Sequence, residues 1–148
     1  MNNCIFCQIV KKEIPADIVF ENNSVVAFLD VNPTNKGHTL VVSKRHFADI
    51  CETDDSIASE IFVKAKNIAH MIVRAVHADG FNLIVNNGSA AGQVVMHTHL
   101  HIVPRFKDDG LKQWPHKVIS KEEMQEIKNK IASFWQSRIT KLLLFLMS

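Results

Sequence analysis

The stretch His97–Val103, HTHLHIV, carries a histidine at every second position. Successive side chains of a β-strand point to opposite faces of a sheet. The spacing therefore predicts a strand over residues 93–103, with its three imidazoles on one face and with Leu100 and Ile102 turned toward a core. We expect Pro104, which lacks a backbone N–H, to end the ladder of this strand. Apolar packing alone does not require an imidazole face, so this strand is the candidate functional element.

The segments on either side predict a small fold of helices and strands. Strands are expected over residues 17–21, 25–31, 38–43 and 81–86. Helices are expected over residues 5–12, 54–77 and about 120–146. The central helix should bury a stripe that includes Ile61 and Phe62. Because the first strands are joined by short turns, we predict an α+β fold with an antiparallel sheet of about five strands.

Length and composition describe an ordinary globular chain. The 148 residues fit one domain over residues 1–148. A formal net charge of +2 argues against a nucleic-acid-binding surface. The apolar run at residues 142–147 is far shorter than the about 18 residues that span a bilayer. With no signal-peptide pattern visible, we expect a cytoplasmic protein without a membrane span.

The chain has three cysteines, of which Cys4 and Cys7 form a C-x-x-C pair. An odd number in a cytoplasmic protein argues against a disulfide framework. The pair is half of a tetrahedral zinc site, for which His46 and His97 are the candidate additional ligands. A redox pair is less favoured because its motif should follow a strand near a βαβ unit. Two core cysteines are the other alternative, and Cys51 is expected to have no special role.

Three interpretations fit the three histidines at positions 97, 99 and 101. The imidazoles are unrelated surface groups, ligands of a catalytic metal, or a nucleophile with two assisting neighbours. Gly88 and Gly92 bracket a loop before the strand that can offer backbone N–H groups to an anion, and Gln93 adds an amide. Arg105, just past the strand, is either near phosphate or simply exposed. An anion-binding loop beside the imidazoles favours phosphorus chemistry.

The segment HTHLHIVPR, residues 97–105, resembles the H-x-H-x-H-x-x signature of the histidine triad (HIT) superfamily. The similarity extends to CIFCQIVKKEIPADIVFENNSVVAFLDVNPTNKGHTLVVSKRHF, residues 4–47, and to NNGSAAGQVVM, residues 86–96. These segments look like the branch that includes the Hint nucleoside phosphoramidases and the bacterial Hit proteins. The resemblance covers about residues 4–106, which implies a domain core over these residues and a C-terminal extension after them. The resemblance implies a HIT-like fold and a nucleotide hydrolase or transferase.

The resemblance implies roles for three histidines. His99 would attack the α-phosphorus of a nucleotide, and water would hydrolyse the resulting nucleotidyl-histidine. A neutral imidazole, with an ordinary pKa of about 6.5, is a competent nucleophile at neutral pH. Its other ring nitrogen must donate a proton, and the resemblance implies a backbone carbonyl of the histidine strand as acceptor. His101 would donate to phosphate and protonate the leaving group, and His38 would support the arrangement.

The resemblance also implies a set of nucleotide-binding residues. Asp30 would accept the ribose hydroxyls, and Asn86 and Gln93 would hold the phosphate or the leaving group. Hint enzymes usually carry Gly-Gln-Ser before the histidine strand, whereas this chain has Val94 in place of the serine. The main-chain N–H of Val94 is then left to bind phosphate. Because the serine hydroxyl is missing, the resemblance is a weaker argument for efficient phosphoramidase activity.

In related zinc-containing proteins the metal ligands match Cys4, Cys7, His46 and His97. The resemblance therefore implies a structural zinc that fixes the N-terminus to the histidine strand. It further implies a homodimer and a purine nucleotide substrate, such as an adenosine 5′-phosphoramidate or an aminoacyl-adenylate. The alternatives are dinucleoside polyphosphate hydrolysis, a nucleotide-binding regulator with negligible turnover, and a metal-hydroxide hydrolase that uses all three triad histidines.

Overall fold

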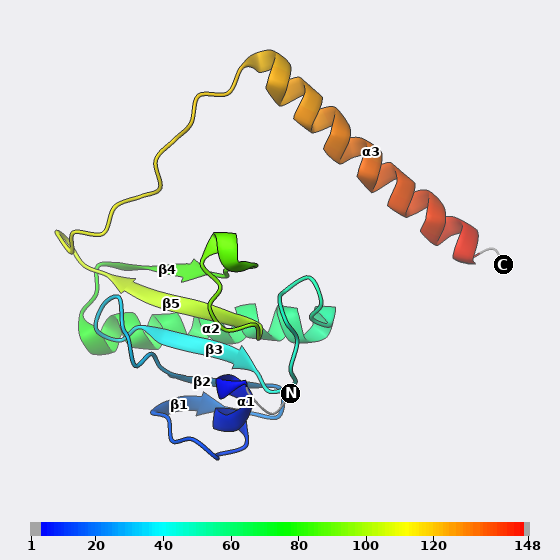
Figure 1. Ribbon diagram of the computed structural model, residues 1–148. Helices are drawn as coiled ribbons and strands as arrows, with labels where there is room; N and C mark the ends of the chain where they lie inside the picture. Colours follow the sequence, from blue (N-terminus) through cyan, green and yellow to red (C-terminus); the bar gives the residue numbers. More distant parts are fainter. Residues whose placement is uncertain (1–3, 147–148) are drawn as a thin grey trace. The chain divides into compact units, whose positions relative to one another are not determined.

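A five-stranded antiparallel sheet forms the centre of the globular part (Figure 1). The computed structural model describes residues 4–146, and the side chains of residues 4–136. The strands are β1 Ile18–Glu21, β2 Val25–Leu29, β3 Thr39–Ser43, β4 Gly80–Ile84 and β5 His99–Arg105, in the spatial order β1-β2-β3-β5-β4. The helices are α1 Ile5–Val10, α2 Asp55–Val76 and α3 Lys121–Leu146, with a 3-10 turn at η1 Ser89–Ala91. The predicted α+β class and its antiparallel sheet are confirmed.

Each face of the sheet packs against one helix. Alternate residues of β2 and β3 enter two separate apolar clusters, one on each face of the sheet, because neighbouring side chains of a strand point to opposite faces. One cluster, here called the α2 cluster, joins Leu100 and Ile102 of β5 to Ile61 of α2. The other joins Phe6 and Ile9 of α1 to residues of β2 and β3. The side chains of β5 that do not enter the α2 cluster share the α1 face with this second cluster.

The predicted apolar stripe of α2 is buried at Ile61, Ala65, Ile68 and Ala69. Phe62 is different, because its side chain is exposed. Adjacent positions of an α-helix lie about 100° apart around the axis, and a helix on a flat sheet buries a narrow stripe. The prediction was therefore wrong for Phe62, which lies beside the stripe and not within it.

The strand β5 begins later than predicted. Residues 93–98 are not strand, and their main chain turns instead. The His97 N–H donates to the Val95 carbonyl at 2.8 Å, and the Thr98 N–H donates to the Phe47 carbonyl at 2.8 Å. These bonds replace ladder bonds, so His97 lies outside the strand that carries the other two triad histidines.

The strand also ends later than predicted, because Pro104 does not stop it. Pro104 and Arg105 pair with Phe81 and Gly80 of β4. Proline is tolerated where a strand has a hydrogen-bonded neighbour on one side only. The pairing of β3 with β5 ends at Ile102, so Pro104 has that one-sided environment.

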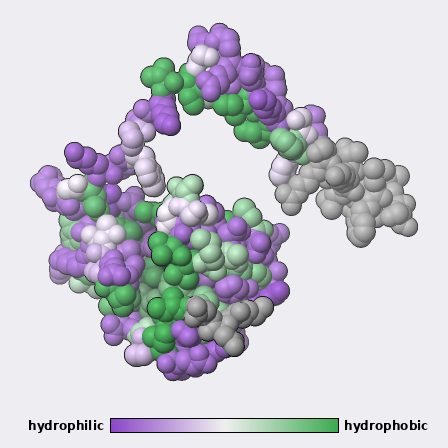
Figure 2. Space-filling model, viewed as in Figure 1, coloured by the Kyte–Doolittle hydropathy of each residue, from purple (hydrophilic) through white to green (hydrophobic). Residues whose placement is uncertain are grey.

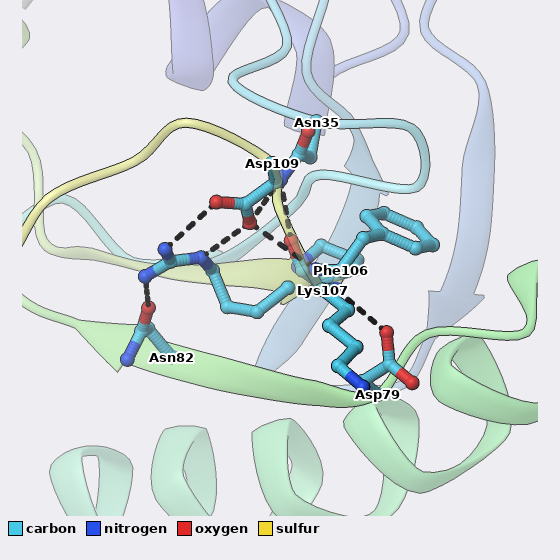
Figure 3. A network of polar contacts seen from close by, with 8 residues as sticks. Asn35, Asp79, Asn82, Phe106, Lys107 and Asp109 are labelled. Atoms are coloured by element: carbon cyan, nitrogen blue, oxygen red, sulfur yellow. Dashed lines mark hydrogen bonds and ion pairs between the residues drawn. The ribbon is translucent and has the colours of Figure 1, made fainter.

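A polar cluster, here called the Asp109 clasp, closes the end of β5 (Figure 3). The Asp109 carboxylate accepts from Arg105 Nε at 2.7 Å and from Arg105 Nη2 at 2.9 Å. It also accepts from the Phe106 N–H and from Asn35 Nδ2, each at 3.1 Å. Arg105 Nη1 donates to Asn82 Oδ1 of β4 at 2.9 Å. Bidentate charge-assisted bonds are among the strongest in proteins, so the clasp fixes the segment after β5 to its neighbours.

The chain divides into two compact units, the first ending at Gly110 and the second beginning at Leu111. In the second unit, Ser120 Oγ accepts from the Glu123 N–H at 3.1 Å, which is a typical N-terminal cap of a helix. Figure 2 shows hydrophobic residues along one side of α3, where Met124, Ile127 and Trp135 are exposed. The apolar run at residues 142–147 lies outside the described side chains. Among the described residues, no helix is long and apolar enough to cross a membrane.

Candidate functional site

His99 and His101 lie side by side on β5, with ring centroids 4.9 Å apart. His99 Nδ1 lies 2.6 Å from the main-chain oxygen of His97. A carbonyl oxygen can only accept, so Nδ1 carries the proton and Nε2 keeps an unprotonated lone pair. Phe6 of α1 meets the His99 ring edge-on, with centroids 5.1 Å apart. His99 is thus held in the tautomer and orientation that a nucleophile requires.

A chain of hydrogen bonds joins His101 to His38 and begins at the main chain. The Thr34 N–H donates to His38 Nδ1 at 3.1 Å, so His38 carries its proton on Nε2. His38 Nε2 lies 2.9 Å from His101 Nδ1 and donates to it. His101 consequently carries its own proton on Nε2. Asp30 Oδ2 lies 3.5 Å from His38 Nδ1 and would form an ion pair with it only if His38 were protonated.

Burial keeps these imidazoles neutral. Loss of solvation lowers the pKa of His101 to about 4, and the neighbouring His99 and His38 add to this effect. Burial also lowers the pKa of His38 and of His99, against a smaller opposing effect of Asp30 on both. For His99, the bond to the His97 carbonyl opposes the effect of burial as well. Neutral imidazole is the form in which histidine acts as a nucleophile.

A pocket of about 380 Å³ opens in front of His99 and His101. Its walls are mostly apolar and come from α1, from the segment after α1 and from β2. Among the described residues, the polar side chains that line it are those of Asp30, Asn32 and the two histidines. Small-molecule sites typically combine an apolar cleft with a few converging polar groups. Asp30, the predicted ribose-binding acid, is therefore placed in the same pocket as the predicted nucleophile.

The loop before β5 forms one side of the pocket, which Gly92 and Val94 line. Gly88 and Gly92 have φ values of 81° and 88°, a region that favours glycine. Gln93 Oε1 accepts from the Gly88 N–H at 2.8 Å, and its Nε2 donates to two main-chain carbonyls at 2.7 and 3.2 Å. Gln93 therefore braces the loop, and its amide is bonded within the protein. Asn86 lies beside the loop, with Nδ2 3.7 Å from where a Cβ on Gly92 would lie.

A second cluster brings together Cys4, Cys7, His46 and His97, whose ligand atoms all lie within 4.8 Å of one another. Each cysteine sulfur lies 3.4 Å from a histidine Nδ1, and the two Nδ1 atoms lie 3.2 Å apart. Tetrahedral zinc, with bonds of about 2.3 Å to sulfur and about 2.0 Å to nitrogen, separates its ligands by roughly 3.3–3.8 Å. The donor set and its spacing therefore fit a zinc ion.

His97 connects this cluster to the pocket. Its Nε2 lies 2.7 Å from the Ser43 carbonyl and donates to it, so the lone pair on Nδ1 faces the cysteines. Burial lowers the pKa of His97 to about 4, which keeps it in the neutral form that binds metals. The three triad histidines therefore do not share one site: His97 faces the cysteines, whereas His99 and His101 line the pocket. This geometry does not favour a metal-hydroxide hydrolase that uses all three.

Three positioning residues were missed from the sequence, namely Phe6, Thr34 and Ser43. Thr34 acts through its main-chain N–H. Ser43 acts mainly through its main-chain oxygen, 2.7 Å from His97 Nε2 against 3.3 Å for its hydroxyl, so the two side chains give little signal. Phe6 stands between the two cysteines, and that position is a signal once α1 is placed against the histidines. Arg105, considered as a phosphate contact or an exposed residue, is half-buried in the Asp109 clasp. It lies six positions beyond His99 on β5, a distance of about 20 Å.

The model of the HIT domain family matches residues 11–108. The chain belongs to the HIT family. An uncharacterized HIT-like protein of Methanocaldococcus jannaschii is 47% identical over 108 residues, which are 72% of this chain and 82% of that protein. Adenylylsulfatase HINT3 of Arabidopsis thaliana is 43% identical over 110 residues, 74% of this chain and 56% of that protein. Adenosine 5′-monophosphoramidase hnt1 of Schizosaccharomyces pombe is 38% identical over 133 residues, 88% and 97% of the two chains.

Solved structures of other HIT proteins share this fold. A HIT family protein from Bacillus subtilis matches with a TM-score of 0.81 and 38% identity, covering 88% of this chain and 96% of that one. A zinc-bound histidine triad family protein from Mycobacterium smegmatis matches with a TM-score of 0.72 and 32% identity, covering 92% and 98%. The predicted family is confirmed. In this HIT protein the cysteine–histidine cluster could hold a metal, as the zinc-bound relative also suggests.

Proposed function

We propose that this HIT protein hydrolyses derivatives of nucleoside 5′-monophosphates through a nucleotidyl-histidine intermediate on His99. The 2.6 Å hydrogen bond from His99 Nδ1 to the His97 carbonyl carries the proposal, because it leaves Nε2 as a fixed lone pair. Attack by Nε2 on the α-phosphorus forms an N–P bond and expels the group attached to phosphate. Water then cleaves the N–P bond, which releases the mononucleotide and regenerates His99.

The neighbouring residues bind and orient the nucleotide. His101 Nε2–H donates to a phosphate oxygen, where a fixed donor stabilises developing negative charge. His38 holds His101 in that donor form through their 2.9 Å bond. Asp30 accepts the ribose hydroxyls, and the apolar wall beside it holds the base.

The loop before β5 completes the phosphate side of the site. We assign phosphate contacts to the main-chain N–H of Val94 and to the Asn86 amide. Gln93, whose side chain is bonded to main-chain groups, holds the loop in the conformation that presents them. A loop of small residues lets its backbone approach an anion closely.

Cys4, Cys7, His46 and His97 would hold a structural zinc. A set of four protein ligands leaves no open position, so the ion supplies rigidity and takes no part in the chemistry. It would fix α1, which forms one wall of the pocket, to the residue whose carbonyl orients His99.

The names of two relatives support this class of reaction. One is an adenylylsulfatase and the other an adenosine 5′-monophosphoramidase. Dinucleoside polyphosphates are the alternative substrates. The purine preference, the homodimer and the cytoplasmic location stay predictions.

The test is mass spectrometry of the intact protein mixed with adenosine 5′-phosphoramidate and quenched in alkaline denaturant. Wild type is expected to release AMP and to carry an adenylyl group that maps to His99. His99→Ala is expected to do neither. His70→Ala, which removes an exposed histidine of α2, is the matched control and should behave as wild type.

The outcomes separate the candidate functions. Nucleotide binding without AMP release or adduct from the phosphoramidate, a diadenosine polyphosphate or adenosine 5′-phosphosulfate would refute the catalytic proposal and favour a nucleotide-binding regulator. Faster AMP release from a diadenosine polyphosphate than from the phosphoramidate would assign the alternative substrate class. An adduct that persists in His99→Ala would show that another residue is the nucleophile.

A further inference from the structure

Val94 stands at the mouth of the pocket. Its side chain is 88% exposed, yet it lines the pocket together with Gly92, His99 and His101. A side chain so exposed contributes little to a core, so burial does not explain an apolar residue here. Val31 is also 88% exposed and lines the same pocket beside Asp30.

The two valines border different parts of a bound substrate. Asp30 fixes the ribose, so the nucleoside occupies the part of the pocket that Val31 borders. His99 and His101 fix the position of the phosphorus. In an in-line displacement the group that leaves the phosphorus departs on the side away from His99 Nε2. Gly92 and the exposed Val94 form an open border of the pocket toward which it can extend.

Few hydrogen-bond donors face this leaving-group side. Among the described residues that line the pocket, apart from Asp30 and Asn32 at its ribose end, only His99 and His101 have polar side chains. The His99 proton is bonded to the His97 carbonyl, and both amide hydrogens of Gln93 are bonded to carbonyls of the loop and its neighbour. The Val94 side chain has no proton to give, and the Val94 main-chain N–H and the Asn86 amide are assigned to the phosphate. Of the side chains that line the pocket, His101 is therefore the donor that remains for the leaving group.

We propose that Val94 makes this site selective for substrates whose leaving group departs as a stable anion, a carboxylate or a sulfate, over substrates whose leaving group is an amine. The inference rests on the proposed function. When His99 Nε2 forms the N–P bond, the electrons of the broken P–O bond remain on a carboxylate or sulfate oxygen, and no proton is needed. When a P–N bond breaks instead, its electrons remain on nitrogen, which must gain a proton to leave as ammonia or an amine.

The electrostatics of the site act in the same direction. Burial lowers the pKa of His101 to about 4. At pH 7 roughly one His101 in a thousand is then protonated. A neutral imidazole is a good hydrogen-bond donor to phosphate but a poor general acid. A leaving group that departs as an anion needs no proton, so the low fraction of protonated His101 does not slow its departure.

The test compares Val94→Thr with Val31→Thr, two near-isosteric changes that each add a hydroxyl to an equally exposed position of the pocket. For each protein, kcat/KM is measured with adenosine 5′-phosphosulfate, as sulfate release, and with adenosine 5′-phosphoramidate, as ammonia release. Wild type should favour the phosphosulfate by at least about tenfold, the effect of one hydrogen bond of about 1.4 kcal/mol. Val94→Thr should reduce that ratio about fivefold through a higher rate with the phosphoramidate. Val31→Thr should leave the ratio unchanged.

Each other result overturns the inference. A wild type that prefers the phosphoramidate, or a Val94→Thr ratio equal to that of wild type, shows that Val94 does not select the leaving group. An equal shift in Val31→Thr shows that any added hydroxyl acts in the same way. If wild type turns over neither substrate, the proposed function fails together with the inference, whereas the first three results leave the proposed function standing.

Discussion

Replacing Leu100 with alanine should separate the stability of the fold from its chemistry. Leu100 lies on β5 between His99 and His101, but its fully buried side chain enters the α2 cluster on the opposite face. β5 pairs with β3 at both histidines and with β4 at His101, so the main chain of the two histidines is held by the sheet. We therefore expect Leu100→Ala to lose stability and to keep a kcat for nucleotide release close to that of wild type.

The magnitude follows from the burial of this side chain. Leucine-to-alanine changes in cores cost about 2.7–5.0 kcal/mol, and the cost is largest where the surroundings cannot close the cavity. Leu100 packs between a hydrogen-bonded sheet and α2, so we expect a loss of about 4 kcal/mol. For a unit of this size the Tm should fall by about 20 °C. The same change at Leu83 on the edge strand β4, whose side chain is 36% exposed, should cost about 1 kcal/mol.

The assay is urea unfolding of both leucine variants, followed by far-UV circular dichroism. Tryptophan fluorescence is unsuitable, because Trp114 and Trp135 both lie beyond Gly110 in the second unit. A loss below about 1 kcal/mol for Leu100→Ala would refute the assignment of this face of β5 to the core. A loss of turnover as large as that of His99→Ala would refute the independence of the two faces.

Three further predictions concern the zinc cluster, the buried imidazoles and the Asp109 clasp. Cys7→Ser should lower both the zinc content, measured by atomic emission, and the Tm, whereas Cys51→Ser should change neither. The urea midpoint should fall as the pH is lowered from about 6.5 toward 4, because unfolded His101 binds a proton more tightly than folded His101, whose pKa is about 4. That slope should be shallower in His101→Gln, and an unchanged slope would contradict the cause. Asp109→Ala should lower the Tm more than Asp54→Ala, since the Asp109 side chain is buried and that of Asp54 is half exposed; equal shifts would count against the clasp.

The alternation of residues 97–103 predicted two of the three triad histidines correctly. His99 and His101 face the pocket, and Leu100 faces the core, as period-two spacing requires. His97 departs from the pattern because its imidazole turns toward Cys4, a residue 93 positions earlier in the chain. Local spacing contains no information about so distant a partner, so the C-x-x-C motif was the better guide to this side chain.

Other parts of the site depend on atoms that every residue type shares. Thr34 and Ser43 orient His38 and His97 through an N–H and a carbonyl, and neither group is specific to a side chain. Gln93 presents a different problem. Its side-chain amide indicates that it forms hydrogen bonds, but the sequence does not say with which group. The sequence favoured a phosphate, whereas the fold places main-chain groups around it.

The amide of Thr34 also makes the proton arrangement robust to mutation. A peptide N–H neither titrates nor accepts, so its bond to His38 sets the direction of every later donor in the chain to His101. Nineteen of the twenty residue types supply that N–H, and proline alone does not. Most substitutions at position 34 should therefore leave the tautomers of His38 and His101 unchanged. The ring ¹⁵N chemical shifts of His38 should match those of wild type in Thr34→Ala and differ from them in Thr34→Pro. The donor direction of these hydrogen bonds is therefore set by a main-chain atom, which side-chain substitutions other than to proline leave in place.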